Sequence, residues 1–289
     1  MSARKAFVRV TCAALVAGVT FASVSAIAQG FGDFLKGNIL NNVPFGKQIS
    51  AVGDAAQALS LTSEQADSIG QSVTMSIAAQ NGGLSRDDRL NDYVSLVGMT
   101  VVNASPWADR PVHFAVINSP IVNAYSAPNG YVLITTGALA QIQDESELAG
   151  VLAHEVGHVV HEHGLAAVRR ANLLKAGVSL ASTNSSFAQL GAVSDYLVDF
   201  LTKQAFDQPA EMEADDSAIE YVTAAGYDPN GYIRFLQRLA VVQAGGGGLF
   251  STHPATADRI KRATADIAKS GYGGGGKRLD DRFRRYTQR

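Results

Sequence analysis

The 289-residue chain has a single cysteine, Cys12, and only 17% of its residues are charged. Cys12 lies in an N-terminal segment that we expect to be removed, so the mature chain would have no disulfide. The formal net charge is −2, and the chain therefore lacks the basic excess with which proteins bind nucleic-acid phosphates. We expect no nucleic-acid partner. The 46% hydrophobic composition is nevertheless sufficient for a sizeable core.

Beyond its N-terminus the chain has no apolar run suited to crossing a membrane. The nearest candidate, residues 176–194, carries no charge, but a Ser-Thr-Asn-Ser-Ser run at residues 182–186 interrupts it. Polar side chains of this kind are costly in hydrocarbon. We therefore expect no transmembrane span in the mature chain.

The first 28 residues have the three parts of a secretory signal peptide. The start is basic, with Arg4, Lys5 and Arg9. Residues 10–23 form an uncharged and largely apolar stretch, and Ala26-Ile27-Ala28 is a small-x-small cleavage site. We predict cleavage after Ala28 and a periplasmic mature protein. An uncleaved anchor helix is the alternative, but the apolar stretch is short for a span.

One short motif carries most of the chemical information: His154-Glu155-Val156-Gly157-His158, within a stretch of helical periodicity. One helical turn brings the two imidazoles to the same face. Two neutral imidazoles at this spacing can take two corners of a tetrahedral Zn²⁺, leaving room for a third protein ligand and a water. Glu155 is then placed to take a proton from that water as a general base. The motif predicts zinc-dependent peptide hydrolysis.

The alternative for this motif is a core helix whose histidines only satisfy backbone groups, which explains each histidine but not the set.

Three other histidines are not expected in the site. His161 lies seven residues from His154, about 10 Å along a helix, whereas zinc reaches only about 2 Å to each nitrogen. We expect His161 and His163 at the surface, and His113 in a strand.

A third ligand is expected from the acidic cluster at residues 211–216, which continues into a helical pattern. Glu211 and Asp215 share one helical face, whereas Glu213 points about 200° away from Glu211. We propose Glu211 as a metal ligand and Asp215 as the partner of the outer nitrogen of a ligating histidine. On spacing alone, an ordinary solvated acidic face is an equal alternative.

Four segments, in this order and spacing, resemble one zinc metallopeptidase family: residues 123–132, the motif at 154–158, residues 211–229, and residues 251–254 with Arg259. The family contains the CAAX prenyl endoprotease, the bacterial heat-shock membrane protease, a mitochondrial inner-membrane protease and periplasmic quality-control proteases. The resemblance implies that His154, His158 and Glu211 hold one Zn²⁺ per chain and that Glu155 is the general base.

Two positions depart from the family pattern. Phe206-Asp207-Gln208-Pro209 stands where the family usually has a Ser-Arg pair before its glutamate ligand, so the role of that arginine does not carry over. Asn129 replaces the first glycine of a turn, a mild change because Asn tolerates positive φ.

His253 and Arg259 have two expected roles. In the family that this chain resembles, the two residues lie by the cleft, where they suit stabilisation of the oxyanion formed during peptide hydrolysis. Alternatively, because a four-glycine run at residues 245–248 precedes it, His253 could take the fourth zinc position and hold the enzyme off. The structural alternative is a loop histidine that caps the next helix.

We predict an α+β, mainly helical, zincin-like (gluzincin) fold with a small β-sheet ahead of the zinc helix. Strands are expected within residues 112–135, and helices near residues 53–80, 85–103, 138–170, 187–205, 209–225 and 229–243. Val132 is predicted at a sheet edge that pairs with extended substrate, with a purely structural hairpin as the alternative.

Four parts of the chain are expected: the signal peptide at 1–28, a loose lead-in at 29–50, the metalloprotease domain at 51–270, and a Gly-rich and basic tail at 271–289. We expect the tail to be a solvated, partly mobile end, with contact to anionic lipid as the alternative.

The predicted function is a metalloendopeptidase, and its substrates, unfolded or misassembled envelope proteins, are implied by the resemblance alone. A zinc-binding chaperone or assembly factor is the alternative, which the intact Glu155 disfavours. A thermolysin-like digestive enzyme would normally show a pro-segment and a calcium-ligand cluster, and neither is evident.

Overall fold

The computed structural model describes residues 63–167, 187–204, 206–244, 252–254, 256–272 and 274–287, all within one compact unit. The predicted signal peptide with Cys12, the lead-in at 29–50 and the four-glycine run at 245–248 lie outside the described residues. Within the described ranges, no helix combines the length and apolar character needed to cross a membrane.

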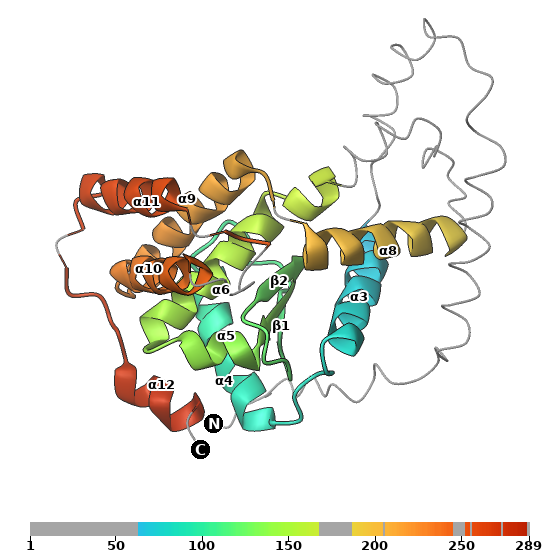
Figure 1. Cartoon of the computed structure of the whole chain (residues 1–289), viewed down its shortest axis with the longest axis horizontal. Helices are drawn as coiled ribbons and strands as arrows, with labels where there is room; N and C mark the ends of the chain where they lie inside the picture. The colour runs from blue at the N-terminus through green and yellow to red at the C-terminus, as the bar shows by residue number, and fades with distance from the viewer. Residues whose placement is uncertain are drawn as a thin grey trace, which may run out of the picture. The chain divides into compact units, whose positions relative to one another are not determined.

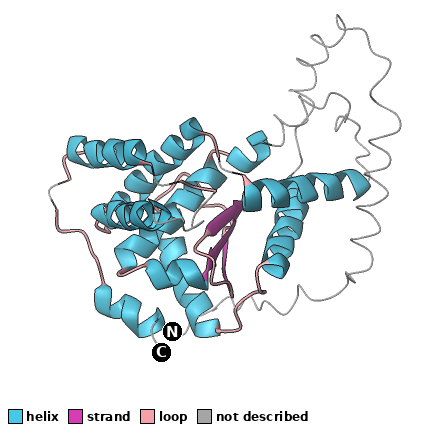
Figure 2. Cartoon of the chain, in the orientation of Figure 1, coloured by secondary structure: helices cyan, strands magenta, loops and turns pink. Residues whose placement is uncertain are grey.

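Three short strands form a mixed sheet in the order β1-β3-β2 (Figure 2). β1 (His113–Ile117) runs parallel to β3 (Tyr131–Thr135), and β2 (Ala124–Ala127) runs antiparallel to it. The turn between β2 and β3 places Asn129 at φ 61° and Gly130 at φ 93°. Both values lie in the left-handed region that Asn and Gly adopt most readily, which explains why Asn serves in place of the glycine.

Helices cover both faces of this sheet, which divides the core in two. Val132 and Ile134 of β3 pack into the cluster that contains α4 (Asp88–Val102) and α6 (Glu145–Val160). Tyr131 and Leu133 pack into a second cluster with α3 (Ser63–Gln80) and α8 (Phe187–Lys203). Because alternate residues of a strand point to opposite faces, every residue of β3 is buried.

The prediction that Val132 lies at a sheet edge is wrong. β3 is the central strand, and Val132 pairs with Phe114 of β1 on one side and Ser126 of β2 on the other. The sequence shows which segments are strands but not the order in which they pair. Of the two edge strands, β2 is the one that contacts α6.

The remaining helices are α5 (Thr136–Gln141), α9 (Gln208–Ala224), α10 (Asn230–Ala244), α11 (Ala257–Lys269) and α12 (Asp280–Thr287) (Figure 1). α9, α10 and α12 pack against α6, whereas α11 packs against α9 and α10, and α5 against β3. The single helix predicted over 138–170 is interrupted before Glu145 and again at Glu162, whose φ of 54° ends the α-helical path. The mainly helical α+β class is confirmed.

α6 is buried along nearly its whole length between α4, α9 and α10. Asp144 caps its N-terminus by accepting from the backbone N–H of Glu147. The helix approaches α10 so closely that a Cβ added to Gly150 would lie 2.6 Å from Cβ of Tyr232. Glycine at this position therefore sets the distance between the two helices.

The expectation of a solvated C-terminal end is wrong for the described residues, because α12 packs against α4 and α6 (Figure 1). Phe283 is 2% exposed, and the ring of Tyr286 stacks on Tyr93 with centroids 4.5 Å apart. Arg278 and Arg282 form ion pairs with the buried carboxylates at the start of α6, Asp144 and Glu145. The basic residues that suggested a solvated end thus neutralise buried acids.

Candidate metal centre

α6 places both motif histidines on one face, one turn apart, as the spacing predicted. Their Nε2 atoms lie 3.1 Å apart, and both rings are buried. Burial lowers the pKa of His158 well below its usual value, and the hydrogen bond with Glu211 only partly opposes this effect. His158 is therefore held as the neutral imidazole that binds metal ions.

Glu211 reaches the two histidines from the first turn of α9. Asp207 caps this helix and Pro209 stands in its first turn, where a proline is well tolerated. Oε2 of Glu211 lies 3.5 Å from Nε2 of His154, and Oε1 lies 3.5 Å from Nε2 of His158. Zinc bonds of about 2.0–2.2 Å at tetrahedral angles separate ligand atoms by about 3.3–3.5 Å. The donor atoms of the three residues, which lie 3.1–3.5 Å apart, thus come close to the spacing of three corners of a zinc site.

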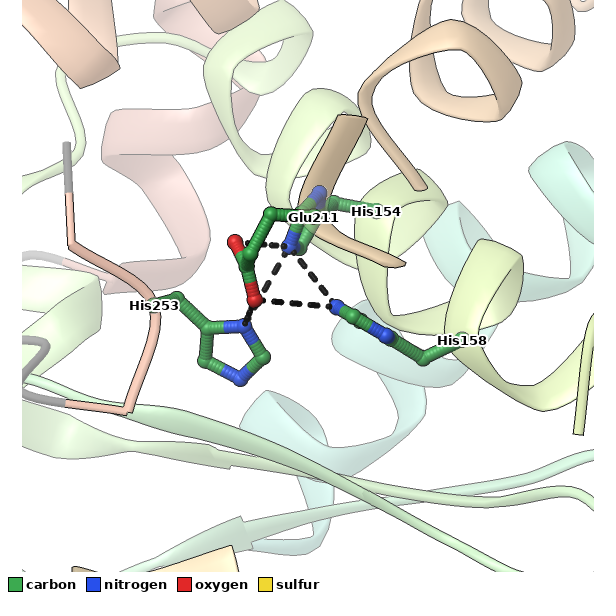
Figure 3. Close-up of side chains that lie close together, drawn as sticks. All are labelled: His154, His158, Glu211 and His253. Atoms are coloured by element: carbon green, nitrogen blue, oxygen red, sulfur yellow. Dashed lines mark hydrogen bonds and ion pairs between the residues drawn. The ribbon is translucent and has the colours of Figure 1, made fainter. Parts of the chain in front are cut away.

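His253 completes the group from the loop before α11 (Figure 3). Its Nδ1 lies 3.3 Å from Nε2 of His154 and 2.8 Å from Oε1 of Glu211. Ligand atoms of His154, His158, Glu211 and His253 all fall within 4.8 Å of one another, and all four residues are buried. Three imidazoles and a carboxylate are donors that suit Zn²⁺. The cap of α11 is Thr256, so His253 is not the helix cap.

The outer nitrogen of His154 has two partners. Its Nδ1 lies 2.9 Å from the hydroxyl of Tyr232 and 3.1 Å from Oδ1 of Asp215, and this hydroxyl donates to Asp215. Burial of His154 disfavours its protonation, but Asp215 and Glu211 outweigh burial and raise its pKa to about 9. Asp215 therefore lies where the sequence placed it. Tyr232 was not anticipated, because nothing in its spacing relates it to the motif.

Arg259 is buried beside the acidic residues. Its guanidinium donates to both carboxylate oxygens of Asp215, to the hydroxyl of Tyr232 and to the carbonyl of Pro254. Its Nη1 also forms an ion pair with Glu211 at 2.5 Å. Each guanidinium nitrogen thus contacts a protein oxygen.

His163 also reaches the site, and the expectation that it lies at the surface is wrong. It is 8% exposed, and its Nδ1 lies 2.7 Å from Nδ1 of His158. The left-handed residue Glu162 redirects the chain after α6 and brings His163 back alongside. His161 is half-buried and contacts the hydroxyl of Ser217 instead.

Phe206, at the position where the sequence departs from the family pattern, packs its ring on His158 with centroids 4.2 Å apart. His113 begins β1, which confirms the predicted strand position.

Glu155 is fully buried at 0% exposure, yet neither carboxylate oxygen accepts a hydrogen bond from a described residue. The imidazole of His253 lies close by, with its Nε2 3.7 Å from Oε1 of Glu155. A buried carboxylate without hydrogen bonds is costly, by several kcal/mol. Such a group fits a site where the carboxylate is reserved for a proton that arrives with the reactants.

A pocket of about 210 Å³ opens beside His158. Its walls come from the end of β2 and the following turn, from the residues around the end of α6, from α3, and from the loop after α4, where Arg110 lies over the ring of Trp107. Ser126 of β2 is part of the wall.

The comparison with known proteins agrees with this geometry. The sequence model of Peptidase family M48 matches residues 88–267. Mitochondrial metalloendopeptidase OMA1 of Schizosaccharomyces pombe is 30% identical over 173 residues, which cover 59% of this chain and 51% of that protein. The Beta-barrel assembly-enhancing protease of Escherichia coli (strain K12) is 30% identical over 193 residues, which cover 62% of this chain and 39% of that protein.

Metalloprotease LoiP of Escherichia coli (strain K12) is 25% identical over 236 residues, which cover 77% of this chain and 88% of that protein. The match therefore spans about half of the first relative, less than half of the second and most of the third.

Proposed function

The chain belongs to Peptidase family M48, and from this premise we propose that it is a zinc-dependent endopeptidase that cleaves unfolded or misassembled envelope proteins. The membership confirms the resemblance inferred from four sequence segments and, with it, the zincin-like fold. One observation carries the proposal. His154, His158 and Glu211 hold their donor atoms 3.1–3.5 Å apart, close to tetrahedral zinc spacing, beside the carboxylate of Glu155, which accepts no hydrogen bond from a described residue.

A bound zinc ion would acidify a water and polarise the scissile carbonyl. Glu155 would take the proton of this water and pass it to the leaving amine, which requires a carboxylate that is free of other donors. Tyr232 and Asp215 would hold His154 with Nδ1 protonated, so that Nε2 faces the metal. The contacts of Arg259 with Asp215 and Glu211 support a positioning role rather than the oxyanion role predicted from sequence.

Extended substrate would pair with the outer edge of β2. The carbonyl of Asn123 accepts from the backbone N–H of Thr135 in β3, and backbone groups alternate in direction along an antiparallel strand. The N–H and C=O of Ser126 should therefore face away from β3, beside the pocket next to His158. Pairing through the backbone is tolerant of sequence, as cleavage of unfolded proteins requires.

The envelope as the site of action is supported by the basic, apolar and small-x-small pattern of residues 1–28. One relative, the Beta-barrel assembly-enhancing protease, is named for the assembly of β-barrel proteins, which supports action on envelope proteins. We propose one Zn²⁺ per chain and unfolded polypeptides as partners.

Incubation of the purified mature chain with an unfolded model protein tests the proposal directly. We expect cleavage at internal peptide bonds, with product N-termini identified by sequencing, and no cleavage after zinc is removed with a chelator or in Glu155→Gln. A chain that binds zinc and prevents aggregation of the unfolded protein but never cuts it would instead be the chaperone alternative.

A further inference from the structure

The outer nitrogen of His158 contacts a second histidine rather than a carboxylate. Nδ1 of His158 lies 2.7 Å from Nδ1 of His163, and the two rings meet edge to face with an interplanar angle of 71°. Nε2 of His163 in turn lies 3.0 Å from Oε2 of Glu213. The three side chains form a continuous hydrogen-bonded path from α9 to the inner face of α6.

Only one arrangement of protons satisfies this path when His158 binds a metal. A metal bond through Nε2 leaves the ring proton of His158 on Nδ1, which then donates to Nδ1 of His163. His163 accepts at Nδ1 and so carries its own proton on Nε2, where it donates to Glu213. An ionised carboxylate only accepts, so the path ends at Glu213 without a conflict.

The chain reaches this arrangement by an unusual local conformation. Glu162 adopts φ 54°, in the left-handed region that is unfavourable for a residue other than glycine. Without that turn, His163 would continue along the helix and away from His158. The strained residue and the buried histidine that follows it therefore belong to the same feature.

Side chains on opposite sides of the first turns of α9 support the two histidine ligands. Glu211 faces the donor atoms of the site, and Glu213, about 200° around the helix, holds His163. Asp215, one turn beyond Glu211, holds His154. Each histidine ligand thus has its own outer partner, and both partners are anchored on the same helix.

We propose that His163 and Glu213 are a positioning pair that fixes the tautomer and the ring orientation of His158. The inference rests on the proposed zinc site and extends it, because it assigns a role to two residues outside the motif. His163 contacts a ligand and not the reactants. Loss of such outer partners typically weakens metal binding by about 10–100-fold.

The test measures metal binding directly, by competition of Zn²⁺ with a chromophoric chelator and by the visible spectrum of the Co²⁺-substituted protein. We expect His163→Ala to weaken Zn²⁺ by about 10–100-fold and to alter the Co²⁺ spectrum. His163→Asn, whose amide can still accept near the Nδ1 position, should recover most of the affinity. Glu213→Ala should show a loss at the lower end of that range, because its side chain is 54% exposed, and Glu213→Gln should recover it.

Two controls lie away from the pair. His113 is exposed at the start of β1, and Glu220 is exposed on α9. His113→Ala and Glu220→Ala should keep the affinity and the spectrum of the wild type. Circular dichroism of each variant separates a folding defect from a metal defect, and His163→Asn serves if His163→Ala does not fold.

An unchanged affinity and Co²⁺ spectrum in folded His163→Ala would overturn the inference, as would an equal loss in His113→Ala. Because the experiment measures metal binding and not proteolysis, failure of the positioning-pair inference can be distinguished from failure of the proposed function. A chain that binds zinc, shows the expected losses and cuts no protein would support the positioning pair and refute the endopeptidase. A wild type that binds no zinc would refute both.

Discussion

Nδ1 of His253 lies 2.8 Å from Oε1 of Glu211, although 42 residues separate them in the sequence. It also lies 3.3 Å from Nε2 of His154, about the distance between two ligands of one zinc ion. The imidazole therefore lies beside the proposed zinc ligands, within reach of the fourth position of a tetrahedral site, and its contact with Glu211 has the length of a hydrogen bond. Of the two roles expected for His253, the contact supports the inhibitory ligand more directly than the oxyanion donor.

For His253→Ala we therefore expect hydrolysis of a short peptide to rise by more than about twofold, because the competing fourth ligand is lost. Loss of an oxyanion donor would instead lower kcat. Steady-state kinetics on one peptide separates the two roles. A rate within about twofold of the wild type would leave His253 only a packing role.

Glu155→Gln should retain zinc, because Glu155 is not among the proposed ligands, and should lose at least about 10²–10⁴-fold in kcat with the general base. Metal content by atomic spectroscopy and peptide hydrolysis measure the two effects separately. Loss of zinc, or activity near that of the wild type, would contradict the assignment.

Removal of a carboxylate on α9 should weaken zinc binding more strongly the closer that carboxylate lies to the proposed metal position. Glu211→Ala should release zinc or bind it very weakly. Asp215→Ala should weaken zinc binding by about 10–100-fold, since among the proposed ligands Asp215 reaches only the outer nitrogen of His154. Asp216→Ala is a suitable control, because Asp216 pairs with Arg262 at the surface. Equal zinc affinity in Glu211→Ala and the control would place the third ligand elsewhere.

Ser126→Pro should raise KM for an unfolded protein without loss of zinc, because proline removes an N–H from the outer edge of β2. Ser126→Ala keeps that N–H and should leave KM unchanged. Unfolding midpoints in urea show whether the sheet remains intact. The same KM in both variants would favour a sheet edge that only has a structural role.

The carboxylate at the cap of α6 should give the fold a specific acid sensitivity. Burial opposes ionisation of Asp144, but the Ser146 hydroxyl, the backbone N–H of Glu147 and two arginines outweigh it and hold its pKa below the usual value. A depressed pKa in the folded state stabilises the protein above about pH 4, and this contribution is lost as the pH falls through the lower folded value.

Asp144→Asn keeps a capping side chain but removes the charge that pairs with Arg234 and Arg278. We expect a loss of about 3–5 kcal/mol of unfolding free energy at pH 7, and a smaller difference from the wild type below pH 4. Urea unfolding at a series of pH values measures it. A difference that does not change with pH would mean that the ion pairs contribute little.

The residues anticipated from the sequence are those whose relation is local. One helical turn fixes His154 against His158, and the same rule relates Glu211 to Asp215, so spacing alone was informative. The meeting of α6 with α9 could be anticipated only by resemblance.

The features that sequence reasoning missed depend on tertiary contacts. Tyr232 reaches His154 because α10 crosses α6, and His163 reaches His158 because Glu162 is left-handed. The position of Val132 depends on the order of strands. In the same way, the arginines around α12 are typical of a solvated end in the sequence, because their buried partners at the start of α6 lie more than 130 residues earlier.

The close approach at Gly150 links a residue that touches no reactant to the chemistry of the site. A methyl group there would meet Tyr232 at 2.6 Å and force apart α6 and α10. The hydroxyl that Tyr232 presents to His154 and Asp215 would move with it. In a screen of random variants for lost activity, changes at Gly150 would therefore be scored together with changes at the ligands, although the position only spaces two helices.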